Sequence, residues 1–475
     1  MAQDSHRLRL GALTALVVGS MVGGGIFSLP QNMAKSAGAG ATLIGWAITA
    51  VGMLMLAFVF QTLANRKPEL DNGVYAYAKA GFGNYLGFSS AWGYWISAWI
   101  GNVSYLVLLF GTLGYFFPAF GEGNTPAAII GASILLWLVH FLVLRGIKEA
   151  AFINLVTTIA KIVPLITFIA LAAVAFKMDV FTADFWGKGN ADLGSVMNQV
   201  KNMMLVTVWV FIGIEGASVY SARAERRSDV GKATVIGFLG VLALLVLVNI
   251  LSLGVMNQPE LAGLKNPSMA YVLERIVGPW GAAFISIGLI VSLAGALLSW
   301  TLLCGEILFS AAKDSTMPAF LRKENKNAVP ANALWLSNGA IQLFLIITLF
   351  SSSSYLQLLY LATSMILLPY FFSTAYAVMI AFKKDGYSNE PAQSGKDLVI
   401  GVIAMIYSIW LVYAAGIQYL LLSALLYAPG ALLYIKARRE NNKTVFTTTE
   451  KVIFALAVVG AIYAAYGLYT GSLSL

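Results

Sequence analysis

Two glycine-rich stretches interrupt long apolar runs, and their backbones could bind a charged ligand. Gly19–Phe27 contains three adjacent glycines, and Trp209–Gly216 contains Gly213 and Gly216 around Glu215. Each glycine costs about 1 kcal/mol of helix stability relative to alanine, so both stretches are expected to unwind. An unwound helix presents amides to a carboxylate and carbonyls to an ammonium. The stretches therefore predict an amino-acid site, although glycine also serves close helix packing.

Three ionisable side chains are expected deep inside apolar runs: Lys161, Glu215 and Glu306. Such groups are costly in hydrocarbon, so a functional role is the first hypothesis and a packing hydrogen bond is the alternative. Glu215 lies in a predicted helix break and is the candidate that couples substrate charge to gate movement. Glu306 follows Trp300 by six residues, so the two face different directions on a helix. We expect Glu306 to pair with Lys161 or to act at an inner gate.

The residues that catalysis and metal binding need are scarce. The chain has one cysteine, Cys304, and two histidines, His6 and His140, with no cluster of acidic residues beside them. This pattern excludes an intramolecular disulfide and argues against a metal site. The sequence also contains no phosphate-binding loop and no nucleophile triad. We therefore expect neither a cofactor nor an enzymatic activity.

The composition is typical of a membrane protein. Of the 475 residues, 59% are hydrophobic and 11% are charged. Many apolar runs approach the roughly 20 residues that span a bilayer as a helix. The predicted fold class is an all-α integral membrane protein with about thirteen transmembrane helices. The expected spans are 11–33, 41–64, 84–117, 126–144, 151–176, 198–221, 233–256, 280–311, 333–351, 356–382, 398–414, 417–435 and 451–469.

The distribution of basic residues predicts the orientation. With the amino terminus in the cytoplasm, most of the 30 lysine and arginine residues fall in cytoplasmic segments, which is the positive-inside pattern. Thirteen spans then put the carboxyl terminus on the opposite, periplasmic side. The net charge of +9 is explained by this topology, so we expect membrane lipid and not nucleic acid as a partner.

The two glycine-rich stretches lie five spans apart, and five is an odd number. Two blocks of five spans would therefore enter the membrane in opposite directions and form an inverted repeat, whose matching helix breaks mark a transporter's binding site. We predict a first repeat at residues 1–180, a second at 195–385, and additional carboxyl-terminal spans at 396–475. A channel is the competing class, but it would need a continuous wet pore or rings of like groups.

Several motifs resemble those of the amino acid/polyamine/organocation transporters. The matching stretches are Gly19–Pro30, Trp95–Asn102, Trp209–Ser218, Gly305–Leu308, Ala311–Asp314 and Met317–Pro318. The sixth-span motif is similar to that of the basic amino-acid/polyamine antiporter branch. The resemblance implies a LeuT-like inverted repeat of five plus five spans, with helices 1 and 6 broken, in a bacterial inner membrane.

The resemblance also implies how the two ends of an amino acid are held. Its α-carboxylate would bind the amides of Gly24 and Gly25, and its α-ammonium would bind the carbonyls of Met21, Trp209 and Ile212. These contacts use the backbone, so they need no particular side chain. They suit any substrate that keeps its carboxylate.

The distal cationic group is assigned, by the same resemblance, to spans 3 and 8. Ser97, Ala98 and Asn102 match its polar partners, and Trp300 matches an aromatic ring that covers it. A guanidinium over an indole face gains about 2 kcal/mol or more when it is desolvated.

Gating residues follow from the resemblance too. Trp209 would cover the bound substrate as part of the outward gate, and Tyr94 and Tyr370 match a distal outer gate. Lys161 matches a fifth-span lysine of sodium-independent relatives, where its ammonium would stand in place of the ion of sodium-driven relatives.

The implied function is secondary transport of cationic amino acids, most closely the exchange of arginine for ornithine. Lysine or other basic amino-acid permeases and arginine/agmatine exchangers are the near alternatives, and a homo-oligomer is possible. Three positions, Gly24, Val210 and Ala362, differ from the serines of arginine/agmatine exchangers. Agmatine lacks a carboxylate and would use the glycine amides poorly.

Overall fold

The computed structural model describes residues 9–70, 73–146, 150–216, 224–350 and 355–473, and within these ranges the regular structure is helical with no β-strand. The first helices are α1 (Leu10–Met21), α2 (Gly25–Ala34), α3 (Ala39–Arg66), α4 (Val74–Phe82), α5 (Asn84–Leu113), α6 (Pro126–Leu144), α7 (Ala150–Ala175) and α8 (Met178–Thr182). The next are α9 (Val196–Trp209), α11 (Arg227–Val255), α12 (Gln258–Ala262), α13 (Ser268–Val277), α14 (Pro279–Lys313), α15 (Ala331–Phe350) and α16 (Tyr355–Lys383). The last are α17 (Gln393–Glu440) and α18 (Thr448–Thr470).

Many of these helices could cross a membrane. In the described ranges, nine are long and apolar enough, or ten if α1 and α2, which meet at a bend of 44°, form one span. This confirms an all-helical, multi-pass membrane protein, whereas the count of thirteen stays a prediction. α17 is 48 residues long and contains a non-helical glycine, Gly416, at φ 75° and ψ 165°. Gly416 falls in the gap between the predicted spans 398–414 and 417–435.

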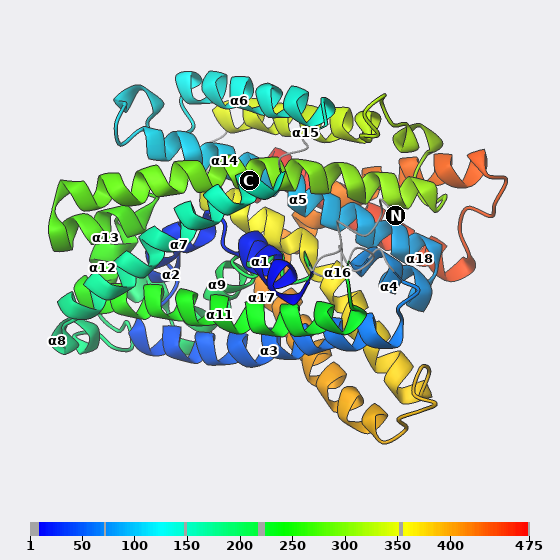
Figure 1. The fold of residues 1–475 in the computed structure, drawn as a ribbon, viewed down its shortest axis with the longest axis horizontal. Helices are drawn as coiled ribbons and strands as arrows, with labels where there is room; N and C mark the ends of the chain where they lie inside the picture. Colours follow the sequence, from blue (N-terminus) through cyan, green and yellow to red (C-terminus); the bar gives the residue numbers. More distant parts are fainter. Residues whose placement is uncertain (1–8, 71–72, 147–149, 217–223, 351–354, 474–475) are drawn as a thin grey trace.

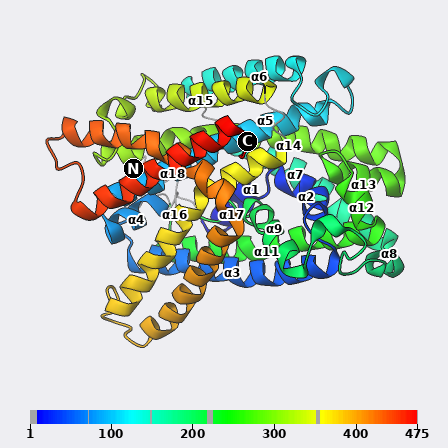
Figure 2. The same ribbon diagram turned by 180° about the vertical axis from the view of Figure 1, so that it is seen from behind.

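The helices differ in how deeply they are buried. In the most apolar window of α5, 89% of the residues are buried, whereas in α18 only 11% are buried. α5 packs against α14 and α16, and α18 packs on α17. Figures 1 and 2 show α6 and α15 together along one edge and α3 and α11 along the opposite edge. α1 and α9 lie between these edges, so the two predicted helix breaks occupy the interior (Figure 1).

The same glycine joint occurs in both halves of the chain. α4 is followed by Gly83 (φ 92°, ψ −177°), after which α5 begins. α13 is followed by Gly278 (φ 85°, ψ −172°), after which α14 begins. This backbone region is strained for every residue except glycine. In each half of the chain, a glycine in the same backbone conformation therefore joins a short helix to a long inner helix.

Candidate functional site

The first helix break lies between α1 and α2. α1 ends at Met21, whose carbonyl accepts a 2.8 Å hydrogen bond from the amide of Gly23. α2 begins at Gly25, and the first amides of a helix have no acceptor inside that helix. The glycines of the break are closely covered: a Cβ built on Gly24 would lie 2.7 Å from Leu108 Cδ2 and 2.8 Å from Leu293 Cδ2. A side chain at Gly24 would therefore require the ends of these two leucines to move aside.

The second break follows α9 and lies directly against the first helix. The chain leaves α9 at Trp209 and turns at Gly213, which has φ +109°. Ser20 Oγ on α1 donates a 2.9 Å hydrogen bond to the Gly213 carbonyl. A Cβ on Gly213 would lie 2.9 Å from Ser20 atoms, so only glycine allows this approach. The two breaks predicted from the sequence therefore meet in the structure.

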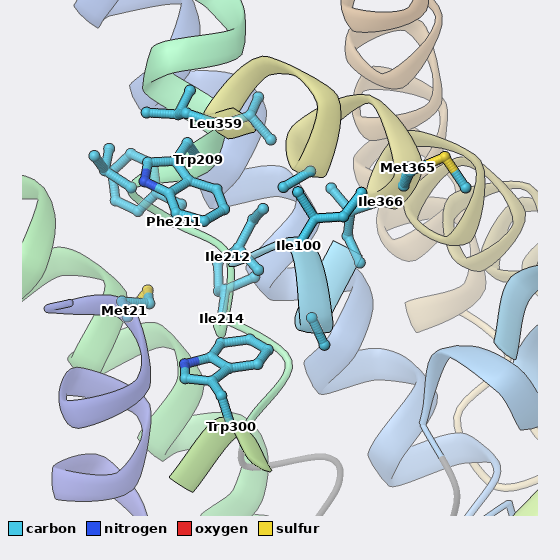
Figure 3. Packing of buried hydrophobic residues seen from close by; sticks show 14 of the residues in the cluster. Met21, Ile100, Trp209, Phe211, Ile212, Ile214, Trp300, Leu359, Met365 and Ile366 are labelled. Atoms are coloured by element: carbon cyan, nitrogen blue, oxygen red, sulfur yellow. The ribbon is translucent and has the colours of Figure 1, made fainter. Parts of the chain in front are cut away.

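A small cavity lies beside the second break. Its lining comprises Ser97, Ala98, Gly101, Tyr105, Trp209, Ile212 and Trp300. Figure 3 shows the indoles of Trp209 and Trp300 on opposite sides of Ile212. The structure thus brings together five of the predicted substrate-binding residues, from α5, α14 and the segment at the end of α9.

The other predicted binding residues flank this cavity without lining it. Met21, Gly24 and Gly25 form the adjacent break, and Gly25 approaches Trp209, since a Cβ there would lie 3.0 Å from the indole nitrogen. Asn102 is fully buried, and neither its amide nitrogen nor its oxygen has a hydrogen-bond partner in the described part of the chain. The hydroxyl of Ser97 is also buried without a partner. Unpaired buried polar groups are costly, so both side chains are suited to a polar ligand.

Glu215 is the centre of a buried hydrogen-bond cluster. Its carboxylate accepts bonds from Tyr94 Oη at 2.7 Å, from Tyr370 Oη at 2.8 Å and from the amide of Gly213 at 3.2 Å. Glu215 is 0% exposed. The cluster joins α5, α16 and the broken helix, so any movement of the broken helix must disturb it.

Two larger cavities lie on either side of the breaks. One of about 700 Å³ is lined by α1 residues, including Leu16 and Ser20, and by Tyr94 and Trp300; we call this the α1 side. The other, of about 1060 Å³, is lined by α2 residues, including Gln31 and Lys35; we call this the α2 side. The Glu215 cluster belongs to the α1 side, whereas Trp209 lies against Gly25 at the start of α2.

This arrangement bears on the expected place of two tyrosines. Tyr94 lines the cavity with the residues that precede the break in α1, and Tyr370 shares Glu215 with it. If the amino terminus is cytoplasmic, the α1 side faces the cytoplasm. In that orientation Tyr94 and Tyr370 would lie on the inner side of the site, which does not fit the expected outer gate; the orientation itself stays a prediction.

The chain is similar in sequence to several known transport proteins. A family model described as amino acid permease matches residues 8–462. The chain belongs to the amino acid permease family. An arginine/ornithine antiporter of Pseudomonas aeruginosa is 70% identical, covering 100% of this chain and 99% of the relative. An L-lysine transport protein of Corynebacterium glutamicum is 46% identical over 100% and 97%, and an arginine/agmatine antiporter of Chlamydia abortus is 43% identical over 95% of each chain. The resemblance seen in the motifs is confirmed.

Lys161 of this permease lies next to the first break. It is 4% exposed, and Nζ donates a 2.8 Å hydrogen bond to the carbonyl of Gly19 on α1. It also lines the cavity on the α1 side. Its ammonium therefore fastens α7 to the last turn of α1, at a backbone carbonyl that would otherwise be available to a cation.

Glu306 is not where the sequence analysis expected it. Its side chain is exposed and Oε1 accepts a 3.3 Å hydrogen bond from Ser310 one turn later. The ion pairs within the described residues do not include one between Glu306 and Lys161, so that predicted pairing is wrong. The reason is position: α14 extends to Lys313, so Glu306 lies about two turns from its end and on its outer face.

The permease site also contains residues that the sequence analysis did not select. Tyr105 lines the cavity, and Leu108 and Leu293 cover Gly24. Ser97, Gly101 and Tyr105 follow one another at intervals of four residues, so helical periodicity would have put Tyr105 on the predicted binding face. The described residues contain no group of three or more His, Cys, Asp or Glu side chains that could hold a metal ion.

Proposed function

We propose that this permease is a secondary transporter that exchanges cationic amino acids by alternating access, taking arginine in and releasing ornithine. The observation that carries the proposal is a cavity lined by Trp209 and Trp300, at the point where two broken helices meet. The relative from Pseudomonas aeruginosa, named an arginine/ornithine antiporter, supports this choice of substrates at 70% identity over the whole chain.

The amino-acid end of the substrate binds at the two breaks. The free amides at the start of α2, at Gly24 and Gly25, hold the α-carboxylate, and the carbonyls of Met21, Trp209 and Ile212 hold the α-ammonium. Met21 and Trp209 each accept one backbone hydrogen bond already, at 2.8 Å and 3.2 Å. A carbonyl oxygen has two lone pairs, so both keep one for the substrate.

The cationic end binds between α5 and α14. The hydroxyl of Ser97 and the amide of Asn102 are buried without partners, and Ala98 leaves space beside them. Trp300 covers the guanidinium or ammonium by a cation–π contact. These groups accept or stack on a cation and carry no charge, so they serve arginine and ornithine alike.

Gating depends on Trp209 and on Glu215. Trp209 closes the cavity toward the α2 side, where its ring lies against Gly25 and Gly101. Glu215, with Tyr94 and Tyr370, closes the path on the α1 side and responds to the broken helix that carries it. Glu306, exposed at the end of α14, keeps at most an inner-surface role.

Lys161 makes transport independent of sodium. Its ammonium occupies the space between α7 and the carbonyl of Gly19, where a bound cation would need that same oxygen. The exchanged amino acids carry the same net charge, so one-for-one exchange moves no net charge across the membrane.

The architecture that suits this cycle is an inverted repeat. The glycine joints at Gly83 and Gly278 recur at equivalent places and support repeats at residues 1–180 and 195–385, followed by extra spans at 396–475. Thirteen spans in a bacterial inner membrane, with the amino terminus in the cytoplasm, complete the proposal. The carboxyl terminus then lies in the periplasm.

The alternatives to this proposal are two other transport activities, lysine transport and arginine/agmatine exchange, and a channel. The relatives from Corynebacterium glutamicum and Chlamydia abortus are named as a lysine transport protein and an arginine/agmatine antiporter. Agmatine has no carboxylate, so it would leave the amides of Gly24 and Gly25 unused. A channel would need a continuous wet pore or rings of like groups, whereas Trp209 and Trp300 line the space at the two breaks.

Counterflow in proteoliposomes tests the proposal. Uptake of labelled arginine should be saturable and should rise when the vesicles contain ornithine or arginine. Vesicles loaded with lysine or agmatine rank the exchange partners in the same experiment. Uptake that does not depend on the amino acid inside the vesicles would contradict an exchanger and favour a channel.

A further inference from the structure

Tyr105 faces the cavity with a hydroxyl that has no partner. The residue is 7% exposed and lines the cavity beside Trp209, with the two ring centroids 6.1 Å apart. In the described part of the chain, Oη makes no hydrogen bond. A hydroxyl that lines the cavity and makes no bond within the protein is free to bond a ligand there.

The hydroxyl lies over the first helix break. A Cβ built on Gly23 would be 2.6 Å from Tyr105 Oη, and one built on Gly24 would be 3.7 Å from Tyr105 Cδ1. Gly25, the next residue, begins α2 and has a free amide because no acceptor precedes it in the helix. The phenol therefore lies close to the break whose amides are free.

Residues of α5 lie at both ends of the proposed substrate. Ser97 lies eight residues before Tyr105, which is about 12 Å along a helix. Ser97 belongs to the cationic end beside Trp300, whereas Tyr105 belongs to the break that holds the carboxylate. A phenol is protonated at neutral pH and can donate a hydrogen bond, and a bond to a carboxylate oxygen is among the stronger ones in proteins.

We propose that Tyr105 Oη donates a hydrogen bond to the α-carboxylate of the bound amino acid and thereby selects amino acids over their amides and decarboxylated amines. This inference rests on the proposed function, because it needs a substrate carboxylate at the α1–α2 break. It makes Tyr105 a specificity-determining residue. Its hydroxyl distinguishes substrates by their α-carboxylate end, whereas Trp300 contacts the cationic end.

The test compares arginine with argininamide, in which a neutral amide replaces the carboxylate. Binding to the purified full chain is measured by calorimetry, with competition against labelled arginine for the weaker ligand. We expect Tyr105→Phe to weaken arginine binding about tenfold, which corresponds to about 1.4 kcal/mol. Binding of argininamide should change less than about threefold, since it has no carboxylate to lose a bond.

Tyr434→Phe is the matched control. Tyr434 is a tyrosine whose hydroxyl also makes no hydrogen bond, but it is fully buried and packs among Tyr85, Phe88 and Phe446, away from the cavity. It should leave both affinities unchanged. If Tyr105→Phe does not fold, Tyr105→Met fills similar space without a hydroxyl and gives the same comparison.

Each outcome has a clear meaning. Equal weakening of arginine and argininamide would show that the hydroxyl does not act through the carboxylate and would overturn the inference. Unchanged arginine affinity beside an active wild type would also overturn it, while leaving the proposed function intact. A wild type that binds no basic amino acid would remove the proposed function itself, and this inference with it.

Discussion

Replacing Glu215 with glutamine tests whether its hydrogen-bond cluster acts as a gate. The carboxylate accepts bonds from Tyr94 and Tyr370 at 2.7 and 2.8 Å and from the Gly213 amide at 3.2 Å. Glutamine has the same shape, but its NH₂ group cannot accept, so at least one donor loses its partner. A hydrogen bond to a charged group contributes about 1.5–3 kcal/mol. The amide NH₂ can donate to a phenol oxygen instead, so the substitution weakens the closed cluster by about 1.5 kcal/mol for each bond that is lost and not replaced.

We expect Glu215→Gln to reduce the exchange rate more than the affinity for arginine. Glu215 is not among the residues that line the cavity between the tryptophans, so arginine affinity should change less than about threefold, or 0.7 kcal/mol. Conformational steps limit many catalytic cycles, and about 1.4 kcal/mol on the limiting step slows it tenfold. Exchange in proteoliposomes should therefore fall about tenfold or more. Calorimetry and exchange are measured on one preparation across a pH series.

Glu324→Gln is the control for this experiment. Glu324 is exposed in the segment after α14, so its substitution removes a carboxylate without disturbing a buried cluster. It should leave both binding and exchange at wild-type values. If Glu215→Gln also exchanges at the wild-type rate, Glu215 only packs helices together. If binding falls in proportion to exchange, the carboxylate supports the site and does not govern a separate gating step.

Three further predictions follow from the same geometry. Trp300→Ala should weaken arginine binding by about 1–2 kcal/mol and Trp300→Phe by less, as measured by calorimetry; equal affinities for all three proteins would remove Trp300 from the site. Because Lys161 occupies the Gly19 carbonyl, replacing sodium with choline should leave exchange unchanged, and accumulation driven by a sodium gradient would refute this reasoning. Gly213→Ala should destabilise the protein by about 1–3 kcal/mol in thermal unfolding, because φ is +109° there. Gly240→Ala, where a Cβ meets open space, should not.

The sequence was sufficient to predict the helix breaks. Three consecutive glycines at Gly23–Gly25 and the pair around Glu215 reduce helix stability locally, and this effect needs no tertiary information. The sequence analysis also placed a boundary between spans 398–414 and 417–435, where the structure has the non-helical Gly416. The recurrence of the breaks five spans apart predicted their meeting, because an inverted repeat brings equivalent segments to one axis.

The direction of a side chain on an apolar helix could not be predicted in this way. Glu306 lies between apolar neighbours, as a buried residue would, but hydrophobicity is similar all round a membrane helix and does not identify its inner face. The same limitation hid Tyr105, whose role depends on Trp209 and Gly23, which lie far from it in the chain. The short helices α4 and α13 were missed because they do not span a membrane.

The two closures that we propose for the site differ in physical character, and this difference constrains how the cycle can work. On the α2 side, Trp209 closes the cavity by ring contacts with Gly25, Gly101 and Tyr105, which are weak individually and easily exchanged for contacts with a substrate. On the α1 side, the proposed closure is Glu215 with its three buried hydrogen bonds from Tyr94, Tyr370 and the Gly213 amide. Opening toward the α2 side therefore needs only a ring to move. Opening toward the α1 side needs a new partner for a buried carboxylate, and a cationic substrate passing the cluster supplies one. An empty site lacks that partner, so the carrier should cross between its two states readily only when it is loaded, which is the property that makes a transporter an exchanger.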